Sequence, residues 1–383
     1  MTYAFDYTPS MPVPFIDLRR FEPGFLDRWA ETCRHLTENT RFVGPPETRE
    51  LEQAMVDRLA VGHAVGCANG TDALQLGLRA LGVGPGDTVL LPDATFWATF
   101  EAVINCGARP VTVDIDPRDL QMDFELFQRA VDEHKPKAAI LVHLYGWGSS
   151  RLDDFRRLCR DRSIALLEDA AQAFGSLWQG HPMLQGAQIA TLSFYPAKVL
   201  GACGDAGLVV CADEALATTV RQLANHGRTH HYHHGLVGWN SRLGGFEAAY
   251  LLQSLDHIDD RLASRQRAAE IYRQRLTELG VTCMAPPEGY VENGYLNVTL
   301  HDPEKRPAIE AVLKERGIGF GNVYPQSVSR QPGAEGSLAG RFGGEEADRL
   351  ARGVLNLPLF AYITDAEIDS VIDAMAHAVR AAD

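Results

Sequence analysis

The stretch that decides the fold is Thr191-Leu192-Ser193-Phe194-Tyr195-Pro196-Ala197-Lys198-Val199-Leu200-Gly201-Ala202-Cys203-Gly204-Asp205-Ala206-Gly207. It has an apolar, strand-like entry, a single lysine, and several small or turn-forming residues after it. Burying an ammonium group costs free energy, and burial lowers the pKa of a lysine so that its amine becomes a usable nucleophile. Lys198 is therefore a candidate for a Schiff-base lysine. From this stretch alone, a loop lysine whose amine reaches water remains an alternative.

Around this stretch, short apolar runs alternate with helical patterns. Strands are predicted at 65–68, 88–91, 109–114, 138–144, 164–167, 189–194 and 208–211. Most of these runs are continuously apolar, which is typical of parallel strands covered on both faces. The pattern predicts an α/β sandwich, a mostly parallel sheet with helices on both faces.

The chain length of 383 residues suits two domains that share an interface. A His-rich and Gly-rich loop at 226–245 interrupts the alternation. After Gly280 a second, distinct α/β pattern follows, with strands predicted at 295–300 and 318–323 and helices at 305–316 and 365–381. We therefore predict a large domain over 1–256, which includes an extended N-terminal arm, and a smaller C-terminal α/β domain over 257–383.

Bulk charge and cysteine content limit the partners and the compartment. The formal net charge of −14 argues against nucleic acid or an anionic membrane as a partner. The seven cysteines form no C-x-x-C pair, and most lie in apolar runs, so they are interpreted as reduced core residues of a cytoplasmic protein. The N-terminus lacks the pattern of a signal peptide, and no apolar run approaches the roughly 18 residues of a membrane span.

Three groups of residues are predicted at the carboxyl ends of strands, where open α/β sheets bind ligands. The first is Gly70-Thr71-Asp72, between a strand and a helix. Glycine lets the backbone approach a ligand, and the free N–H groups of a helix N-terminus suit a phosphate. A plain helix cap made by Thr71 or Asp72 is the alternative.

The second group is Glu168-Asp169, which closes a buried strand. A carboxylate there could pair with a pyridine nitrogen, keep it protonated, and so make the ring an electron sink. Gln172 is near enough to reach a hydroxyl of the same ring. The alternative is that Asp169 caps the next helix.

The third group is Phe96 and Trp97, either of which could stack on a flat ring or belong to an ordinary core. Ser193, five residues before Lys198, could bind the same phosphate as Gly70-Thr71-Asp72. A phosphate cradle, a stacking aromatic, an acid at a strand end and a lysine together point to pyridoxal phosphate (PLP) as the cofactor.

The sequence resembles the DegT/DnrJ/StrS family of PLP-dependent sugar aminotransferases over about residues 15–360. The motifs that carry the resemblance are Phe42-Val43-Gly44-Pro45, Ala68-Asn69-Gly70-Thr71-Asp72-Ala73-Leu74, Gly82-Val83-Gly84-Pro85-Gly86-Asp87, Thr95-Phe96-Trp97-Ala98-Thr99, Val113-Asp114-Ile115-Asp116-Pro117, His143-Leu144-Tyr145-Gly146, Glu168-Asp169-Ala170-Ala171-Gln172-Ala173, the lysine stretch, and Val237-Gly238-Trp239-Asn240-Ser241-Arg242-Leu243. This resemblance implies the type I PLP-dependent transferase fold.

The resemblance also implies a role for each matching residue. Lys198 would form the Schiff base, Asp169 would face the ring nitrogen, Gln172 the ring hydroxyl, and Phe96 the ring face. Thr71, Asp72 and Ser193 would hold the phosphate. Asn240 would reach the phosphate in the neighbouring subunit of a homodimer. Arg242 would face the same neighbouring site and bind a carboxylate, or form a structural ion pair at the interface.

The implied reaction moves an amino group from an amino acid, by analogy L-glutamate, to a nucleotide-linked keto sugar in amino-sugar biosynthesis. Tyr324 is assigned to the sugar side of the pocket, where Val323-Tyr324-Pro325 replaces the family's usual His-Tyr-Pro. Gly244-Gly245-Phe246-Glu247 also departs from the family pattern. Tyr232-His233-His234 and the motif after it most resemble aminotransferases of UDP-3-oxo-N-acetyl-hexuronic acids.

Three other interpretations stay open at this point. A PLP-dependent sugar dehydratase of the same family would carry histidine in place of Lys198. A regulatory or binding homologue would keep the fold without turnover. The histidines between 226 and 234 could suggest a metal, but their spacing fits no helical ligand pair, so no metal is predicted. A solvated loop, or one near a nucleotide diphosphate, explains them equally well.

Overall fold

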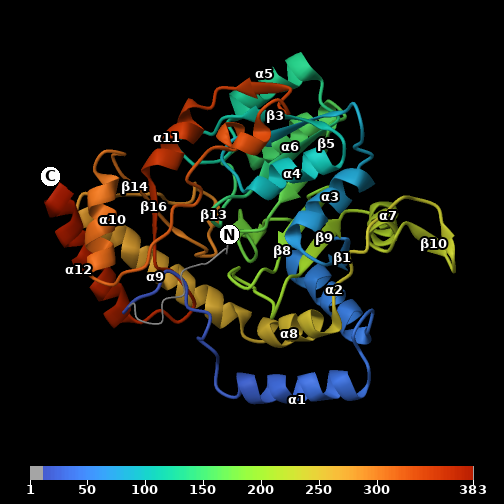
Figure 1. Cartoon of the computed structure of the whole chain (residues 1–383), viewed down its shortest axis with the longest axis horizontal. Coiled ribbons are helices and arrows are strands. Elements are labelled where there is room, and N and C mark those ends of the chain that lie inside the picture. Colours follow the sequence, from blue (N-terminus) through green and yellow to red (C-terminus); the bar gives the residue numbers. More distant parts are fainter. Residues whose placement is uncertain (1–11, 383) are drawn as a thin grey trace.

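The structure, a computed structural model, describes residues 12–382, so the predicted arm before residue 12 lies outside the described residues. An eight-stranded sheet crosses the molecule in the order β1-β9-β8-β5-β4-β2-β3-β15 (Figure 1). Its strands are β1 (His63–Cys67), β2 (Thr88–Pro92), β3 (Arg109–Val113), β4 (Ala138–Val142), β5 (Ala165–Asp169), β8 (Ile189–Ser193), β9 (Gly207–Cys211) and β15 (Gly340–Phe342). Strand β9 runs antiparallel to both of its neighbours, and the other strands run parallel to one another.

Helices cover this sheet in two groups. Helix α3 (Gly70–Ala80) packs against α4 (Trp97–Asn105) and α7 (Glu214–Ala224). Helix α5 (Phe124–His134) meets α6 (Leu152–Asp161) through the ring of Phe155, whose centroid lies 4.9 Å from that of Phe127. The strands β2 and β4 are buried at every position, as expected for a sheet covered on both faces. The predicted α/β/α sandwich with a mostly parallel sheet is confirmed.

Three further helices flank this body. Helix α2 (Pro46–Leu59) begins at a proline and packs against α8 (Gly245–Leu255). Helix α1 (Phe25–Glu38) lies along α8 at the edge of the molecule (Figure 1). The ring of Phe42 stacks on that of Phe246 at 6.2 Å, which ties the segment between α1 and α2 to α8.

A second hydrophobic core is formed mainly by the C-terminal part of the chain. Its sheet joins β12 (Thr282–Cys283), β14 (Asn297–Leu300) and β16 (Val354–Leu357). Three helices accompany it: α9 (Ile258–Glu278), α10 (Arg306–Glu315) and α12 (Asp365–Ala382). The two separate cores agree with a second α/β unit, while the division at 256/257 stays a prediction.

The C-terminal region also reaches back to the large sheet. Strand β15 pairs with β3, and α11 (Glu345–Gly353) follows it, with Ala347 and Leu350 buried in the first core. The sequence pattern did not predict β15, because three residues are too few to show a strand period. The small elements that complete the chain are β6 (Leu177–Trp178), β7 (His181–Pro182), β10 (Arg228–His230), β11 (His233–His234), β13 (Tyr290–Val291), η1 (Val328–Arg330) and η2 (Pro332–Ala334).

The predicted strand at 318–323 is wrong. This segment makes only two isolated bridges, Val13 with Ile318 and Gly321 with Asn356. The position beside β14 is taken by β16, which the sequence pattern did not predict. A Cβ on Gly319 would lie 2.2 Å from the backbone nitrogen of Phe15. Glycine there lets the N-terminal segment run close beside 318–321.

The cysteine prediction is confirmed at four positions and wrong at one. Cys67, Cys106, Cys159 and Cys211 are buried and free, whereas Cys203 is exposed. Cys203 follows the lysine loop, where the apolar run has already ended. Among residues 12–382, none of the helices has the length and apolar character that crossing a membrane requires.

Parallel pairing brings the chemically interesting strand ends to one edge. In the register of the sheet, Asp169 of β5 lies between Val142 of β4 and Thr191 of β8. Strand β1 runs parallel to β8, because both pair antiparallel with β9. The start of α3, the end of β5 and the lysine loop therefore meet at the carboxyl edge of the sheet.

Candidate active site

Lys198 projects from a tight loop that follows β8. Backbone hydrogen bonds close this loop: Lys198 N donates to Tyr195 O at 2.8 Å, and Ala202 N donates to Phe194 O at 2.7 Å. A Cβ on Gly201 would lie 2.3 Å from Pro196 O, so only glycine fits. The lysine itself is half-buried, and its Nζ donates to Tyr295 Oη at 3.3 Å. The structure thus directs the amine at another side chain inside the site.

Asp169 ends β5 as a buried carboxylate close to this lysine. Its Oδ1 accepts from Ala171 N at 3.0 Å, and its Oδ2 lies 3.5 Å from Thr99 Oγ1. Burial raises the pKa of Asp169, while the Ala171 N–H and the charge of Lys198 act in the opposite direction. No helix follows Asp169 directly, so the helix-cap alternative is wrong.

The neighbouring Glu168 points into a separate buried polar cluster. Arg156 donates to both of its carboxylate oxygens, from Nε at 2.8 Å and from Nη2 at 2.9 Å. His143 Nε2 lies 2.9 Å from Glu168 Oε2. Burial raises the pKa of Glu168, but the bonds to His143 and Arg156 outweigh it, so the pKa is lowered overall. Of the two adjacent acids, Glu168 is an ionised carboxylate already bonded to Arg156 and His143, and Asp169 faces the site.

The start of α3 lies directly against the end of β8. The cap of the helix is Asn69, whose Oδ1 accepts from Asp72 N at 2.8 Å. The alternative of a cap by Thr71 or Asp72 is therefore wrong. A Cβ on Gly70 would lie 2.7 Å from the Cβ of Ser193, so this glycine permits the close contact. The start of α3 at Gly70 and the side chain of Ser193, both predicted to hold a phosphate, thus lie together.

Gln172 is fixed by two tyrosines from distant parts of the chain. Its Oε1 accepts from Tyr145 N at 2.7 Å, and its Nε2 donates to Tyr324 Oη at 2.8 Å. An amide nitrogen carries two N–H donors. One N–H therefore remains for a ligand oxygen, in keeping with the ring-hydroxyl role predicted for Gln172.

Phe96 and Trp97 have different surroundings. Trp97 stacks on Phe100 with ring centroids 4.6 Å apart, and it packs against the first core. Phe96 is 48% exposed, and its ring lies 5.6 Å from that of Tyr324. Of the two aromatic candidates, Phe96 is the one with a face free to stack on a ligand.

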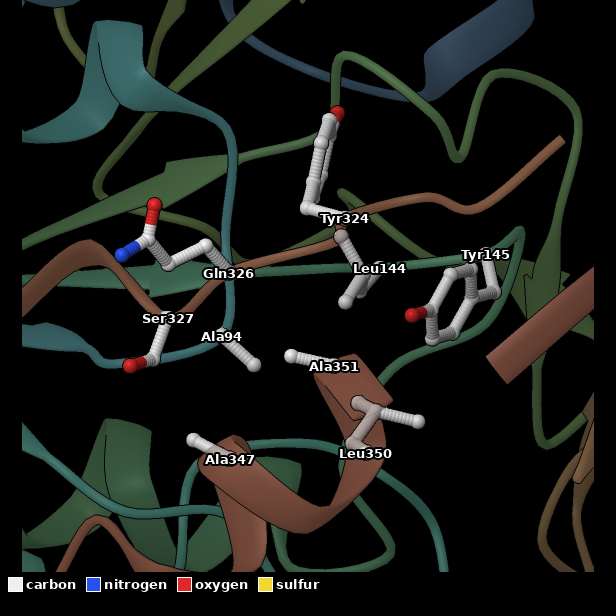
Figure 2. A pocket seen from close by; sticks show the side chains of 9 residues that line it. All are labelled: Ala94, Leu144, Tyr145, Tyr324, Gln326, Ser327, Ala347, Leu350 and Ala351. Carbon is white, nitrogen blue, oxygen red and sulfur yellow. The ribbon is translucent and has the colours of Figure 1, made fainter. Parts of the chain in front are cut away.

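A small pocket lies beside Tyr324, on the side away from its hydroxyl group (Figure 2). It is lined by Ala94, Leu144, Tyr145, Tyr324, Gln326, Ser327, Ala347, Leu350 and Ala351. Its volume of about 10 Å³ has room for about one water molecule. The hydroxyl of Tyr324 points away from this pocket, toward the Gln172 side (Figure 2). With a volume of about 10 Å³, the pocket is too small to hold a sugar.

Sequence reasoning did not find Tyr295, Asn293 or the backbone role of Tyr145. Tyr295 precedes β14, in the region predicted as the second domain, so nothing in the sequence links it to Lys198. Asn293 is fully buried and bonds to the 172–174 backbone. Its position after a glutamate, before a glycine, is typical of an ordinary turn. Tyr145 lies within a quoted family motif, but its contact is made by its backbone N–H.

Asn240 and Arg242 lie beside the end of α7. Asn240 forms a bridge with Asn225, and Arg242 Nη1 donates to Asn225 Oδ1 at 3.4 Å. Both are exposed. Ser241, between them, accepts from Ala68 N at 3.2 Å, near the start of α3. The prediction that Asn240 and Arg242 reach a partner's site stays a prediction.

The histidine-rich segment forms the hairpin β10–β11, which projects from α7 (Figure 1). His233 Nδ1 lies 2.8 Å from Thr229 Oγ1, and Arg228 Nη2 lies 2.9 Å from His231 Nδ1. Within residues 12–382, no group of three or more His, Cys, Asp or Glu side chains is arranged to hold a metal ion.

The sequence and the fold were compared with those of known proteins. Residues 27–376 match the DegT/DnrJ/EryC1/StrS aminotransferase family. The chain belongs to this family. It is 36% identical over 365 residues to the UDP-2-acetamido-2-deoxy-3-oxo-D-glucuronate aminotransferase of Pseudomonas aeruginosa, which covers 95% of this chain and 99% of the relative.

Two further similarities extend over the same length. The UDP-N-acetyl-3-dehydro-alpha-D-glucosamine 3-aminotransferase of Acidithiobacillus ferrooxidans is 35% identical, covering 94% of this chain and 96% of that protein. The crystal structure of DesV from S. venezuelae, in complex with a ketimine intermediate, superposes with a TM-score of 0.90 at 33% identity, covering 95% of this chain and 98% of that one. The prediction of a PLP-dependent aminotransferase of this family is confirmed.

The side chains at this edge of the sheet fit PLP, the cofactor of the family. Within residues 12–382, no cation is bonded to the buried Asp169 carboxyl, and a protonated ring nitrogen would supply one. The close contact of Gly70 with Ser193 leaves a helix N-terminus and a hydroxyl side by side for a phosphate. The half-buried Lys198 supplies the amine.

Proposed function

We propose that the protein is an aminotransferase that moves an amino group from an amino acid to a nucleotide-linked keto sugar, with L-glutamate as the donor. The observation that carries the proposal is the meeting of Lys198, Asp169 and Gln172 with the start of α3 at one sheet edge. The names of the relatives, which act on UDP-linked 3-oxo sugars, support the sugar and its nucleotide.

Each side chain has a part in this proposal. PLP supplies a covalent link to the amino group and an electron sink for the carbon next to it. The Lys198 amine binds the cofactor, and once freed it moves a proton between carbon atoms as general base and acid. Asp169 holds the ring nitrogen in its protonated form. Gln172 orients the ring hydroxyl, and Phe96 covers one face of the ring.

The phosphate end is held by Thr71, Asp72 and Ser193, with Gly70 allowing the approach. Backbone N–H groups at the start of α3 attract the negative charge. The Asp72 carboxyl would need a shared proton to bind the phosphate, because two anions repel and its backbone N–H already donates to Asn69. This end fixes the cofactor while the amino group is exchanged.

On the substrate side we assign Tyr324 and Arg242. Tyr324 lies next to Phe96 and Gln172, so it borders the face from which a sugar would approach. Arg242 would bind a carboxylate bidentately, which favours an acidic sugar of the 3-oxo-hexuronate kind or the carboxylate of the donor. The relative from Pseudomonas aeruginosa acts on such a uronate by its name.

A homodimer with shared sites is part of the proposal. Several large apolar side chains are exposed in the single chain: Phe42 (47%), Val43 (62%), Tyr232 (85%) and Val237 (83%). Tyr232 lies in the turn of the β10–β11 hairpin, and Val237 lies between that hairpin and Asn240. Burial of these surfaces against a second copy would bring Asn240 to the phosphate in the partner. We also assign the protein to the cytoplasm, a compartment that contains nucleotide sugars and keeps thiols reduced. The two domains are assigned to residues 1–256 and 257–383.

A cofactor titration followed by donor addition tests the proposal. The purified protein with PLP should show absorbance of the lysine-linked cofactor, and L-glutamate should remove it as the amine form of the cofactor accumulates. Lys198→Ala should never show that absorbance. Retention of the band with every amino acid would overturn the proposal, and would favour a regulatory homologue. Release of water from a keto sugar without transfer of nitrogen would favour the dehydratase.

The sugar is identified in the reverse direction. UDP-linked 3-amino sugars, with and without a C6 carboxylate, and 4-amino sugars are each incubated with 2-oxoglutarate. Formation of glutamate from a 3-amino uronate alone supports the subgroup assignment. Formation from a 4-amino sugar alone contradicts it.

A further inference from the structure

Tyr295 is the contact of the Lys198 amine, and the proposed function gives it no part. Nζ donates to its hydroxyl at 3.3 Å and lies 5.0 Å from the centroid of its ring. We propose that the Tyr295 hydroxyl is a positioning group that holds the Lys198 amine whenever the amine is not covalently bound, and so fixes the point from which it transfers a proton. This inference rests on the proposed role of Lys198.

Hydrogen bonds through Asn293 link the backbone of Tyr295 to the loop that carries Gln172. Tyr295 N donates to Asn293 Oδ1 at 2.9 Å. Asn293 Nδ2 donates to the carbonyls of Gln172 at 2.8 Å and of Phe174 at 2.9 Å. Asn293 is fully buried, and a Cβ on Gly146 would lie 2.2 Å from its Oδ1, so the amide has no room to move. The hydroxyl is therefore placed relative to the same loop that positions the proposed cofactor contact.

On the other side, helix α9 holds the same segment. Gly294 has φ +63°, and a Cβ there would lie 2.7 Å from the Cβ of Arg265. The buried Arg265 donates from Nη1 to Gly294 O at 3.3 Å and to Leu359 O at 3.2 Å. Tyr295 is thus presented from a segment that two separate sets of hydrogen bonds hold in place, which is what a positioning group requires.

The hydroxyl and the ring of Tyr295 contribute differently. The ring face attracts an ammonium without fixing its direction. The hydroxyl oxygen gives one acceptor in one place, and so defines where the nitrogen lies. Tyr295→Phe removes the second effect and keeps the first. Tyr362→Phe is the matched comparison, since its hydroxyl is bonded to Glu22 instead.

The first measurement uses the cofactor-free protein. Lys198 is labelled with acetic anhydride at neutral pH, and the rate is followed by mass spectrometry of its peptide. The hydrogen bond from Nζ to the Tyr295 hydroxyl must break before the amine can attack the reagent. Tyr295→Phe should therefore speed labelling of Lys198 by about threefold or more, since one neutral hydrogen bond contributes about 1 kcal/mol. Tyr362→Phe should leave the rate unchanged. Equal rates in wild type and Tyr295→Phe would overturn the inference.

The second measurement uses the enzyme with PLP in a single half-reaction with glutamate. Loss of the positioning contact should slow the proton-transfer step by about tenfold, while the glutamate concentration for half-maximal rate changes by less than about twofold. A merely structural role would raise that concentration instead, and would contradict the inference. Borohydride fixes the cofactor covalently at its lysine. If no cofactor mass is found on Lys198 in the wild-type protein, the proposed function fails; if it is found and the Tyr295→Phe rates are normal, only this inference fails.

Discussion

Gln172 and Tyr324 are 152 positions apart in the chain, and the Gln172 Nε2 donates to the Tyr324 Oη at 2.8 Å. The bond joins the end of the large sheet to a segment of the C-terminal part. The surroundings of Tyr324 keep its hydroxyl protonated. Burial raises the pKa of Tyr324 well above the usual range, and the charges of Tyr295 and Tyr145 add to the effect. Tyr324 therefore stays a neutral phenol that accepts from Gln172.

We expect Tyr324→Phe to weaken cofactor binding through Gln172. Without the hydroxyl, the Gln172 amide keeps only the Tyr145 N–H as a fixed partner. A lost hydrogen bond of about 1 kcal/mol corresponds to roughly a fivefold rise in the Kd for PLP, measured by titrating cofactor-free protein. The ring contact with Phe96 is preserved in phenylalanine.

A double-mutant cycle provides the control for this prediction. Gln172→Leu alone should cost at least as much as Tyr324→Phe, and the two together should cost little more than Gln172→Leu. Additive losses would mean that Tyr324 acts on the cofactor by a route that does not include Gln172. Tyr362→Phe, whose hydroxyl bonds Glu22 away from this edge, should bind PLP as the wild type does.

Asp169→Asn should separate catalysis from stability. The asparagine cannot keep a ring nitrogen protonated, so the rate of the half-reaction with glutamate should fall by about 100-fold or more. In the cofactor-free protein the same change removes a buried carboxyl that carries no bonded cation, so the melting temperature should stay the same or rise. A normal rate, or a large loss of stability without cofactor, would contradict the assigned role. Glu168→Gln is the contrast, since it breaks the bonds of Arg156 and should destabilise the protein with or without PLP.

The contact between Gly70 and Ser193 predicts that Gly70→Ala weakens phosphate binding. The new Cβ would lie 2.7 Å from the Ser193 Cβ, so the start of α3 and the end of β8 must move apart. We expect the Kd for PLP to rise by about tenfold, whereas the Kd for pyridoxal, which has no phosphate, should change little. Gly84→Ala is the matched control, because nothing lies within 4 Å of a Cβ there. An equal loss for both ligands would contradict a phosphate-specific effect.

Sequence reasoning reached the large sheet and the residues at its carboxyl edge for a physical reason. Strands β2, β4, β5 and β8 are continuous apolar runs, and parallel order places Asp169 and Lys198 at the same edge. The start of α3 was equally readable, because a glycine between a strand and a helix is a local signal. Only the identity of the cap, Asn69, was missed there.

The parts that sequence reasoning missed depend on contacts between distant segments. Tyr295 meets Lys198 across 97 positions, and Tyr324 meets Gln172 across 152. Strand β16 pairs with β14, whereas the predicted strand at 318–323 does not form, because the choice between two short apolar segments is made by packing. No periodicity within one segment carries that information.

His301 should make stability depend on pH below neutrality. Burial, together with the positive charge of Arg306, lowers the pKa of His301 from 6.5 to about 4. Its Nε2 lies 2.8 Å from Thr299 Oγ1, beside the sheet of the second core. Between about pH 6.5 and pH 4 the unfolded chain binds a proton at His301 that the folded chain does not. The contribution to stability is therefore complete above pH 6.5 and is lost as the pH falls toward 4.

His301→Gln tests this by removing the proton-binding site. The free energy of unfolding, measured by urea denaturation at pH 7 and at pH 4.5, should fall less in the variant, by on the order of 1–2 kcal/mol. Other carboxylates titrate in the same window, so the difference between variant and wild type is the quantity that matters. Parallel pH curves for His301→Gln and wild type would show that the folded protein binds this proton as readily as the unfolded chain.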